Sequence, residues 1–200
     1  KCLPEMKNRF KVPESIEPYS GIIYFVVLLM LSHFFWKFTV IGNETETVVT
    51  FFGMNISAPF NFMADHVARV TAWLLETMGY AISLSADNVV RHNNNVAVHV
   101  VWACTGLKQA YIFVCIIAFY RGTLKDKLWF IALGLVVVYV FNIFRIVVIT
   151  ALIKEHPEWF YILHEHVFKY LFYVIIFGMW IYWEEVVSKK KVQSSKKQVD

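Results

Sequence analysis

Apolar residues along this chain gather into long runs that are separated by short polar segments. A membrane-spanning helix needs about 20 apolar residues at a rise of 1.5 Å per residue. The pattern predicts an all-α polytopic membrane protein, organised as a single membrane domain with a four-span helical bundle. The predicted spans are residues 21–41, 105–120, 128–153 and 159–183.

The segment between the first two runs, residues 42–103, mixes apolar stretches with polar and charged residues. Within it, Phe60 to Tyr80 is apolar but carries Asp65, Arg69 and Glu76 on one side of a helix. This spacing predicts an extracytoplasmic amphipathic helix at the membrane surface, with Asp65, His66 and Arg69 on a solvated face.

Residues 81–103 alternate between the two faces of an extended chain and are rich in β-branched side chains. Val96, Val98 and Val100 would share one face, while Ala97, His99 and Val101 share the other. The run Asn93–Asn95 suits a tight turn, so we expect a short β-hairpin here.

The composition fits a membrane protein and not an ordinary soluble domain. Hydrophobic residues make up 58% of the chain and charged residues 17%, whereas globular domains have about 45–50% and about 25%. The net charge of +4 sits mostly at the ends of the apolar runs, which argues against a nucleic-acid partner. Three cysteines are too few for a disulfide framework; Cys115 suits a core position, and Cys2 lies on a polar leader.

The distribution of Lys and Arg predicts the orientation. Four lie in the leader, residues 1–20, three in the loop 121–127 and five in the tail, residues 184–200, but two in residues 42–103. Basic residues favour the cytoplasmic side. We therefore expect a multi-pass protein of the cell (inner or plasma) membrane with a cytoplasmic leader, a cytoplasmic basic tail and an extracytoplasmic segment 42–103. A fifth span at residues 60–80 would break this agreement.

Three chemically active side chains fall at the predicted extracytoplasmic ends of three different spans. Cys104 precedes the second span, Arg145 lies at the outer end of the third, and His164 is one turn into the fourth. An ionisable group at membrane depth costs at least about 2.5–3.5 kcal/mol, so such groups usually have a function. We expect the three to meet in space.

The neighbours of these residues strengthen a catalytic interpretation. A thiol at a helix N-terminus is favoured as thiolate, and Lys108, one turn after Cys104, adds positive potential. Asn142 and Arg145 are three residues apart on one helix face, so Asn142 could orient the guanidinium toward a carboxylate or an oxyanion. The alternatives are a buried structural thiol, a snorkelling arginine and an interfacial histidine.

No metal or cofactor site is expected from the sequence. His164 and His166 point to different sides of a helix, and Phe168 stands where a zinc-binding helix motif needs its second histidine. A serine nucleophile elbow and a glycine-rich phosphate loop are also missing. We assign His33 and Lys37, one turn apart in the first span, to packing or snorkelling.

Two short motifs and a later histidine resemble the exosortase/archaeosortase family of membrane-embedded cysteine transpeptidases. Ala103-Cys104-Thr105-Gly106-Leu107-Lys108 is similar to the family's A-C-S-G-x-R box, and Asn142-Ile143-Phe144-Arg145 is similar to its N-x-x-R. His164 follows in the family's order. Thr105 and Lys108 depart from the family's serine and arginine, and a lysine binds a carboxylate less specifically than an arginine does.

The resemblance implies a role for each matching residue. Cys104 would be the nucleophile, Arg145 would steady the oxyanion or the thiolate, and His164 would be the general acid and base, without a metal or cofactor. Gly106, Lys108 and Asn142 would support them. His166 is the alternative candidate for the acid and base. His164 fits the resemblance better, because Phe168, four residues after it, matches the family's pattern after its histidine.

The resemblance also implies the substrates, which would be membrane-anchored exported proteins with a C-terminal sorting signal. The chain would cleave that signal through a thioester and transfer the protein to an acceptor. Two alternatives stay open: a small membrane transporter, and a non-catalytic scaffold of a surface-polymer export system. The transporter would need inverted repeats or matched broken helices, which the sequence lacks.

Overall fold

The computed structural model describes residues 19–42 and 48–196, so most of the predicted leader and the last residues of the tail lie outside it. Five longer helices form the bulk of the fold, joined by a 3₁₀ turn at Trp102–Thr105, another at Pro157–Trp159 and a π-helical segment at Ile162–Val167. The helices are α1 (Ser20–Thr39), α2 (Ser57–Thr77), α3 (Leu107–Phe119), α4 (Leu124–Ile153) and α5 (Phe168–Lys196).

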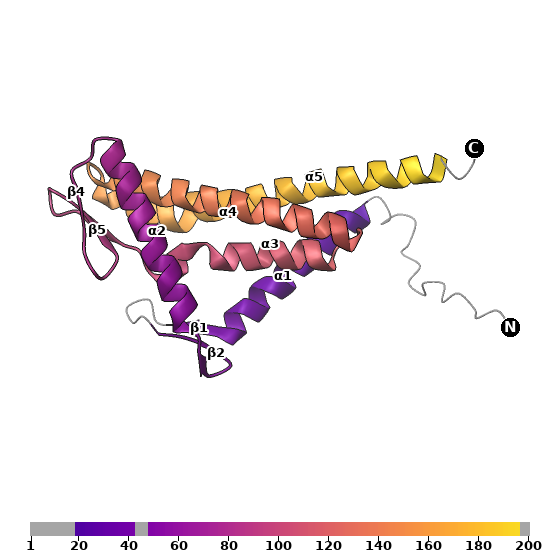
Figure 1. Cartoon of the computed structure of the whole chain (residues 1–200), viewed down its shortest axis with the longest axis horizontal. Coiled ribbons are helices and arrows are strands. Elements are labelled where there is room, and N and C mark those ends of the chain that lie inside the picture. The colour runs from indigo at the N-terminus through magenta and orange to yellow at the C-terminus, as the bar shows by residue number, and fades with distance from the viewer. Residues whose placement is uncertain (1–18, 43–47, 197–200) are drawn as a thin grey trace.

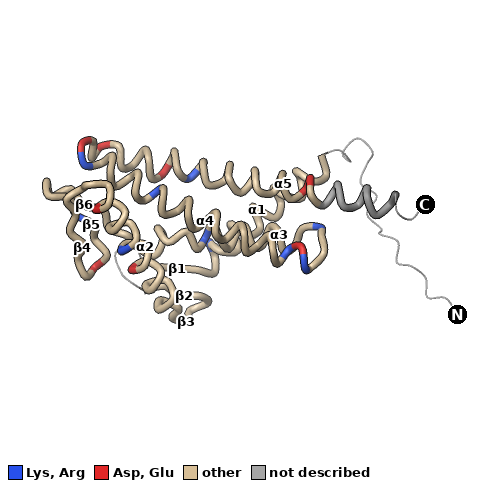
Figure 2. Tube along the Cα trace, turned by 45° about the horizontal axis from the view of Figure 1, so that its top comes forward, with Lys and Arg blue, Asp and Glu red and all other residues tan. Residues whose placement is uncertain are grey.

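Helices α3, α4 and α5 run side by side along the long axis, and α1 lies obliquely against α3 (Figure 1). Helix α2 crosses this bundle steeply near one end, where the strands also gather. Charged positions are concentrated near the helix ends, with few along their middles (Figure 2). This distribution suits a bundle whose central part faces lipid.

The number of membrane-spanning helices differs from the prediction. Among the described residues, three segments are long and apolar enough to cross a bilayer: Ser20–Thr39, Leu124–Ile153 and Pro157–Val186. Helix α3 has 13 residues, which reach about 20 Å, less than the hydrocarbon thickness of about 30 Å. It is shorter than the predicted span 105–120 because Gly106, in a left-handed conformation, delays its start to Leu107. Four spans are therefore not confirmed.

The fold is mostly helical and not purely so, because six short strands in the described ranges form two antiparallel sheets. The second sheet contains the predicted hairpin, with its turn at Asn93–Asn95, and adds a further strand. The first sheet was not predicted; its strands are two or three residues long, too short for an alternation pattern. The first sheet contains, in spatial order, β1 (Val40–Gly42), β2 (Val49–Phe51) and β3 (Met54–Asn55). The second sheet contains, in spatial order, β4 (Ile82–Leu84), β5 (Val89–His92) and β6 (Ala97–His99).

The predicted amphipathic helix is present as α2, which begins earlier than expected, at Ser57. Asp65 and Arg69 form an exposed ion pair at 2.9 Å. His66 is not purely solvated, because its Nε2 lies 2.8 Å from the hydroxyl of Tyr139 on α4. The apolar face of α2 packs against α4 and against the second sheet. Helix α2 and the second sheet therefore lie over one end of the long helices.

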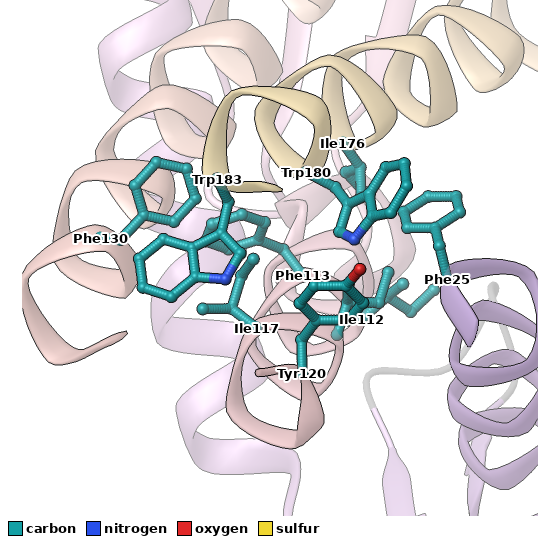
Figure 3. Close-up of a cluster of buried hydrophobic side chains, with 10 residues drawn as sticks. Phe25, Ile112, Phe113, Ile117, Tyr120, Phe130, Ile176, Trp180 and Trp183 are labelled. Carbon is teal, nitrogen blue, oxygen red and sulfur yellow. The ribbon is translucent and has the colours of Figure 1, made fainter. Parts of the chain in front are cut away.

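One cluster of buried aromatic and aliphatic side chains joins α1, α3, α4 and α5 (Figure 3). It is centred on Phe113, Trp180 and Trp183, all at most 4% exposed. Gly134 lets α4 approach α3 closely, because a Cβ there would lie 2.1 Å from the Phe113 ring. Cys115, expected in the core, is half-buried in α3.

Candidate active site

Cys104 lies in the 3₁₀ turn that leads into α3. Within this turn the Thr105 hydroxyl donates to the carbonyl of Trp102 at 2.7 Å, which fixes the backbone around the thiol. The turn passes into Gly106, whose φ of 77° is a conformation that glycine adopts at little cost. Helix α3 starts directly afterwards, so the thiol is placed just before a helix N-terminus and is half-buried.

Asn142 of α4 holds this turn in place. The side chain is fully buried, and its Nδ2 donates to the carbonyl oxygen of Cys104 at 2.9 Å. A Cβ on Gly106 would lie 3.0 Å from the Asn142 side chain, so the glycine also permits close contact. The sequence predicts that Asn142 orients Arg145, and the structure corrects this prediction. Asn142 Oδ1, the atom that could accept a hydrogen bond from the guanidinium, has no hydrogen-bond partner within the described residues. The side-chain amide of Asn142 instead binds the backbone of Cys104.

His164 faces the thiol from the π-helical segment. Its Nε2 lies 3.9 Å from Cys104 Sγ, within the longer reach of a hydrogen bond to sulfur. Its Nδ1 lies 3.1 Å from the Glu165 carboxylate, which in turn pairs with Lys169 at 3.5 Å. The Phe160 ring stacks on the imidazole at 5.3 Å between centroids. These contacts hold the imidazole between a carboxylate and a thiol, and π-helical turns often occur at functional positions.

Arg145 completes the group from α4. The side chain is 6% exposed, its Nε has no hydrogen-bond partner among the described residues, and its guanidinium lies 5.9 Å from the centre of the Phe172 ring. A buried guanidinium with a donor still unused is placed to bind an anion, because leaving such a donor unsatisfied is costly.

Cys104, Arg145 and His164 line one small pocket of about 20 Å³, room for about one water molecule. Apolar side chains form most of its wall, which lowers the local dielectric and strengthens electrostatic interactions inside. The remaining lining residues are Val98, His99, Val100, Ile146, Ile149 and Phe160.

Sequence reasoning missed several residues of this site. Glu165 was considered only as part of a metal motif, although its spacing to Lys169 is that of a helical ion pair. His99 is the last residue of β6, between the buried Val98 and Val100 in sequence, and it reaches the pocket wall. The hairpin pattern placed His99 on the opposite face from these valines but could not show that the sheet would cover Cys104.

Two predicted supporting residues lie away from the pocket. His166 is exposed, its ring packs edge-on against Tyr161 at 5.5 Å, and it is not part of the pocket lining. Lys108 is half-buried on α3 and is not part of the pocket lining. Within the described residues no group of three His, Cys, Asp or Glu side chains is arranged to hold a metal ion.

Comparison with known proteins gives a consistent result. The sequence model of the transmembrane exosortase family (Exosortase_EpsH) matches residues 20–182. Archaeosortase A of Haloferax volcanii is similar, with 27% identity over 110 residues that cover 51% of this chain and 36% of that protein. The chain thus matches little more than a third of that relative's length, and no solved structure matches it. Because the family model covers most of the sequence, this chain belongs to the transmembrane exosortase family.

Proposed function

We propose that this protein is a membrane-embedded cysteine peptidase and transpeptidase that removes the C-terminal sorting signal of membrane-tethered exported proteins. The observation that carries the proposal is the 3.9 Å approach of Cys104 Sγ to His164 Nε2 in a pocket that Arg145 also lines. A nucleophile next to a base, which is itself bonded to a carboxylate, is the arrangement of covalent acyl-transfer catalysis. Membership of the exosortase family supports it.

The first half of the reaction forms a thioester. His164 Nε2 takes the proton of the Cys104 thiol, and the sulfur attacks the carbonyl carbon of the scissile peptide bond. The resulting oxyanion is stabilised by the guanidinium of Arg145, an interaction worth about 10²–10³ in rate for comparable donors. His164 then gives its proton to the leaving amine, the C–N bond breaks, and the signal peptide departs.

The second half transfers the protein to an acceptor. An acceptor amine, hydroxyl or water attacks the thioester carbonyl while His164 removes its proton, and the C–S bond breaks to return the thiolate. Glu165 acts as a positioning residue, because its bond to Nδ1 keeps Nε2 directed at the sulfur. Splitting one acyl transfer into two steps lowers the barrier that each must cross.

The membrane supplies much of the orientation. A substrate held by its own transmembrane helix diffuses in two dimensions, and its scissile bond stays near one interface. We propose that this interface is the extracytoplasmic one, as the excess of basic residues in the leader, the 121–127 loop and the tail indicates. The second sheet and α2 lie over the pocket end of α4 and would limit the access of water.

Co-expression with a tailed substrate tests the proposal. Cys104→Ala should abolish processing, whereas Cys115→Ala, which removes the other described thiol, should leave it intact. Undiminished processing by Cys104→Ala would overturn the enzyme and favour the non-catalytic scaffold.

A further inference from the structure

A second group of charged side chains lies outside the pocket, where α1, α3 and α5 meet. His33 on α1 reaches across to α5, with its Nδ1 3.4 Å from the hydroxyl of Tyr173. Trp36 packs on Tyr111 with ring centroids 5.1 Å apart, which holds the same part of α1 against the first turns of α3. Lys37 follows His33 by one turn of α1, Lys169 precedes Tyr173 by one turn of α5, and Lys108 precedes Tyr111 by one turn of α3, so the two contacts bring the three lysines to one junction.

The charges at this junction are strongly unbalanced. The charges that act on His33 are the positive charges of Lys37, Lys108 and Lys169. The charges that act on Lys108 are the positive charges of Lys37 and Lys169. Among the described residues, one carboxylate contacts the group, that of Glu165, which pairs with Lys169 and also holds His164. Within the part of the chain that the structure describes, Lys37, Lys108 and His33 therefore have no carboxylate partner, at a place where each uncompensated cation is costly.

The surroundings of this cationic cluster (His33, Lys37, Lys108 and Lys169) are apolar and exposed. On α1, Phe34 and Phe38 flank it and are 47% and 72% exposed. On α5, Tyr170 and Val174 flank it and are 64% and 62% exposed. Both helices belong to segments that are long and apolar enough to cross a membrane, so we expect these exposed side chains to face lipid. An anion that reaches the cluster along this surface would carry an apolar tail.

We propose that the cationic cluster binds the phosphate headgroup of an anionic membrane lipid, with the acyl chains against the exposed side chains of α1 and α5. Basic pockets between transmembrane helices favour such headgroups because the phosphate neutralises several cations at once. Lys37 and Lys169 are exposed and can meet the phosphate at the membrane surface, whereas the half-buried Lys108 holds it from below.

This site is distinct from the pocket but lies beside it. Lys108, in the first turn of α3, follows Cys104 by four residues, and Lys169 pairs with the carboxylate that contacts His164. A bound lipid would therefore fix the relative positions of α1, α3 and α5 next to the thiol. Binding of the lipid requires no catalysis, so the proposal can be tested apart from the proposed function.

Native mass spectrometry of the full chain in detergent provides the test. The probes are dioleoylphosphatidylglycerol, which is anionic, dioleoylphosphatidylcholine, which is zwitterionic, and inorganic phosphate. We expect phosphatidylglycerol to bind at least about tenfold more tightly than phosphatidylcholine, because each basic side chain near the phosphate contributes a factor of about five.

Lys37→Gln should weaken phosphatidylglycerol binding about fivefold, and Lys37→Gln with Lys108→Gln should weaken it further. Lys37→Arg should retain binding, as should Lys125→Gln, a matched exposed lysine in the first turn of α4, beyond the far end of α3. Cys104→Ala should also bind normally, which separates this result from any failure of the catalytic proposal. Equal binding of the two lipids, unchanged binding by the double variant, or displacement by an equal concentration of inorganic phosphate would overturn the lipid site.

Discussion

Cys104 Sγ and His164 Nε2 lie 3.9 Å apart although 60 residues separate them in the chain. The thiol is held by a turn before α3 and the imidazole by the π-helical segment before α5, while α4 lies between them in sequence and supplies Arg145. Three segments thus contribute one side chain each to a single small pocket. This convergence is the basis of the predictions that follow.

Glu165→Gln should slow substrate processing by about tenfold, because the amide cannot hold the imidazolium as the carboxylate does, whereas His164→Ala should cost the full 10²–10⁴ of a general base. The Glu165 effect is smaller because its side chain is 43% exposed. Initial rates of processing in membranes measure both. Glu158→Gln is the matched control, because Glu158 makes the same kind of bond to His156 at 3.2 Å away from the pocket. Equal rates for Glu165→Gln and wild type would remove Glu165 from the mechanism.

Arg145→Lys should reduce processing by about 10²–10³, because a lysine retains the charge but not the planar set of donors that an oxyanion requires. The thiol should stay reactive, so alkylation of Cys104 by iodoacetamide should proceed within about twofold of the wild-type rate. A combined loss of alkylation and processing would show that Arg145 supports the fold or the thiolate and not the oxyanion.

Gly106→Ala should destabilise the protein by about 1–2 kcal/mol and abolish processing, because the new methyl group combines an unfavourable φ with a contact of 3.0 Å to Asn142. Two control variants separate the causes. Gly79→Ala carries the same backbone strain with nothing within 4 Å, and Gly178→Ala carries neither the strain nor a contact. Thermal unfolding in detergent and processing assays give the comparison; if Gly79→Ala loses as much activity as Gly106→Ala, the contact with Asn142 is irrelevant.

Gly134→Ala should lower the free energy of unfolding by about 1–3 kcal/mol, because its methyl group would overlap the ring of Phe113 between α3 and α4. Phe113→Leu in the same chain should recover part of this loss by vacating the space. Unfolding in a denaturing detergent measures both variants. If Gly134→Ala alone is as stable as wild type, the two helices are not packed as closely as described.

The meeting of Cys104, Arg145 and His164 in the candidate site could be predicted from the sequence, because these residues break strong local patterns. A thiol before a helix, a guanidinium at the end of an apolar run and an imidazole in the next run are each conspicuous at membrane depth. The hairpin around Asn93–Asn95 was equally clear, since alternation and turn residues coincide there.

The remaining features depend on tertiary contacts that no local pattern encodes. The first sheet has strands of two or three residues, and it forms because β1 continues α1 and the Phe52–Gly53 turn returns the chain. The sequence places Asn142 on the same helix face as Arg145. The hydrogen bond from Asn142 to the Cys104 carbonyl, however, depends on how α3 and α4 pack. The length of α3 was overestimated because the turn at Gly106 interrupts an apolar stretch.

The most direct test of the central claim is mass spectrometry of the full chain after incubation with a membrane-tethered, tailed substrate. The account predicts a substrate acyl group attached through a thioester to the peptide that contains Cys104, released by hydroxylamine and absent from Cys104→Ala. An acyl group on Cys115, or continued processing of the substrate by Cys104→Ala, would contradict it.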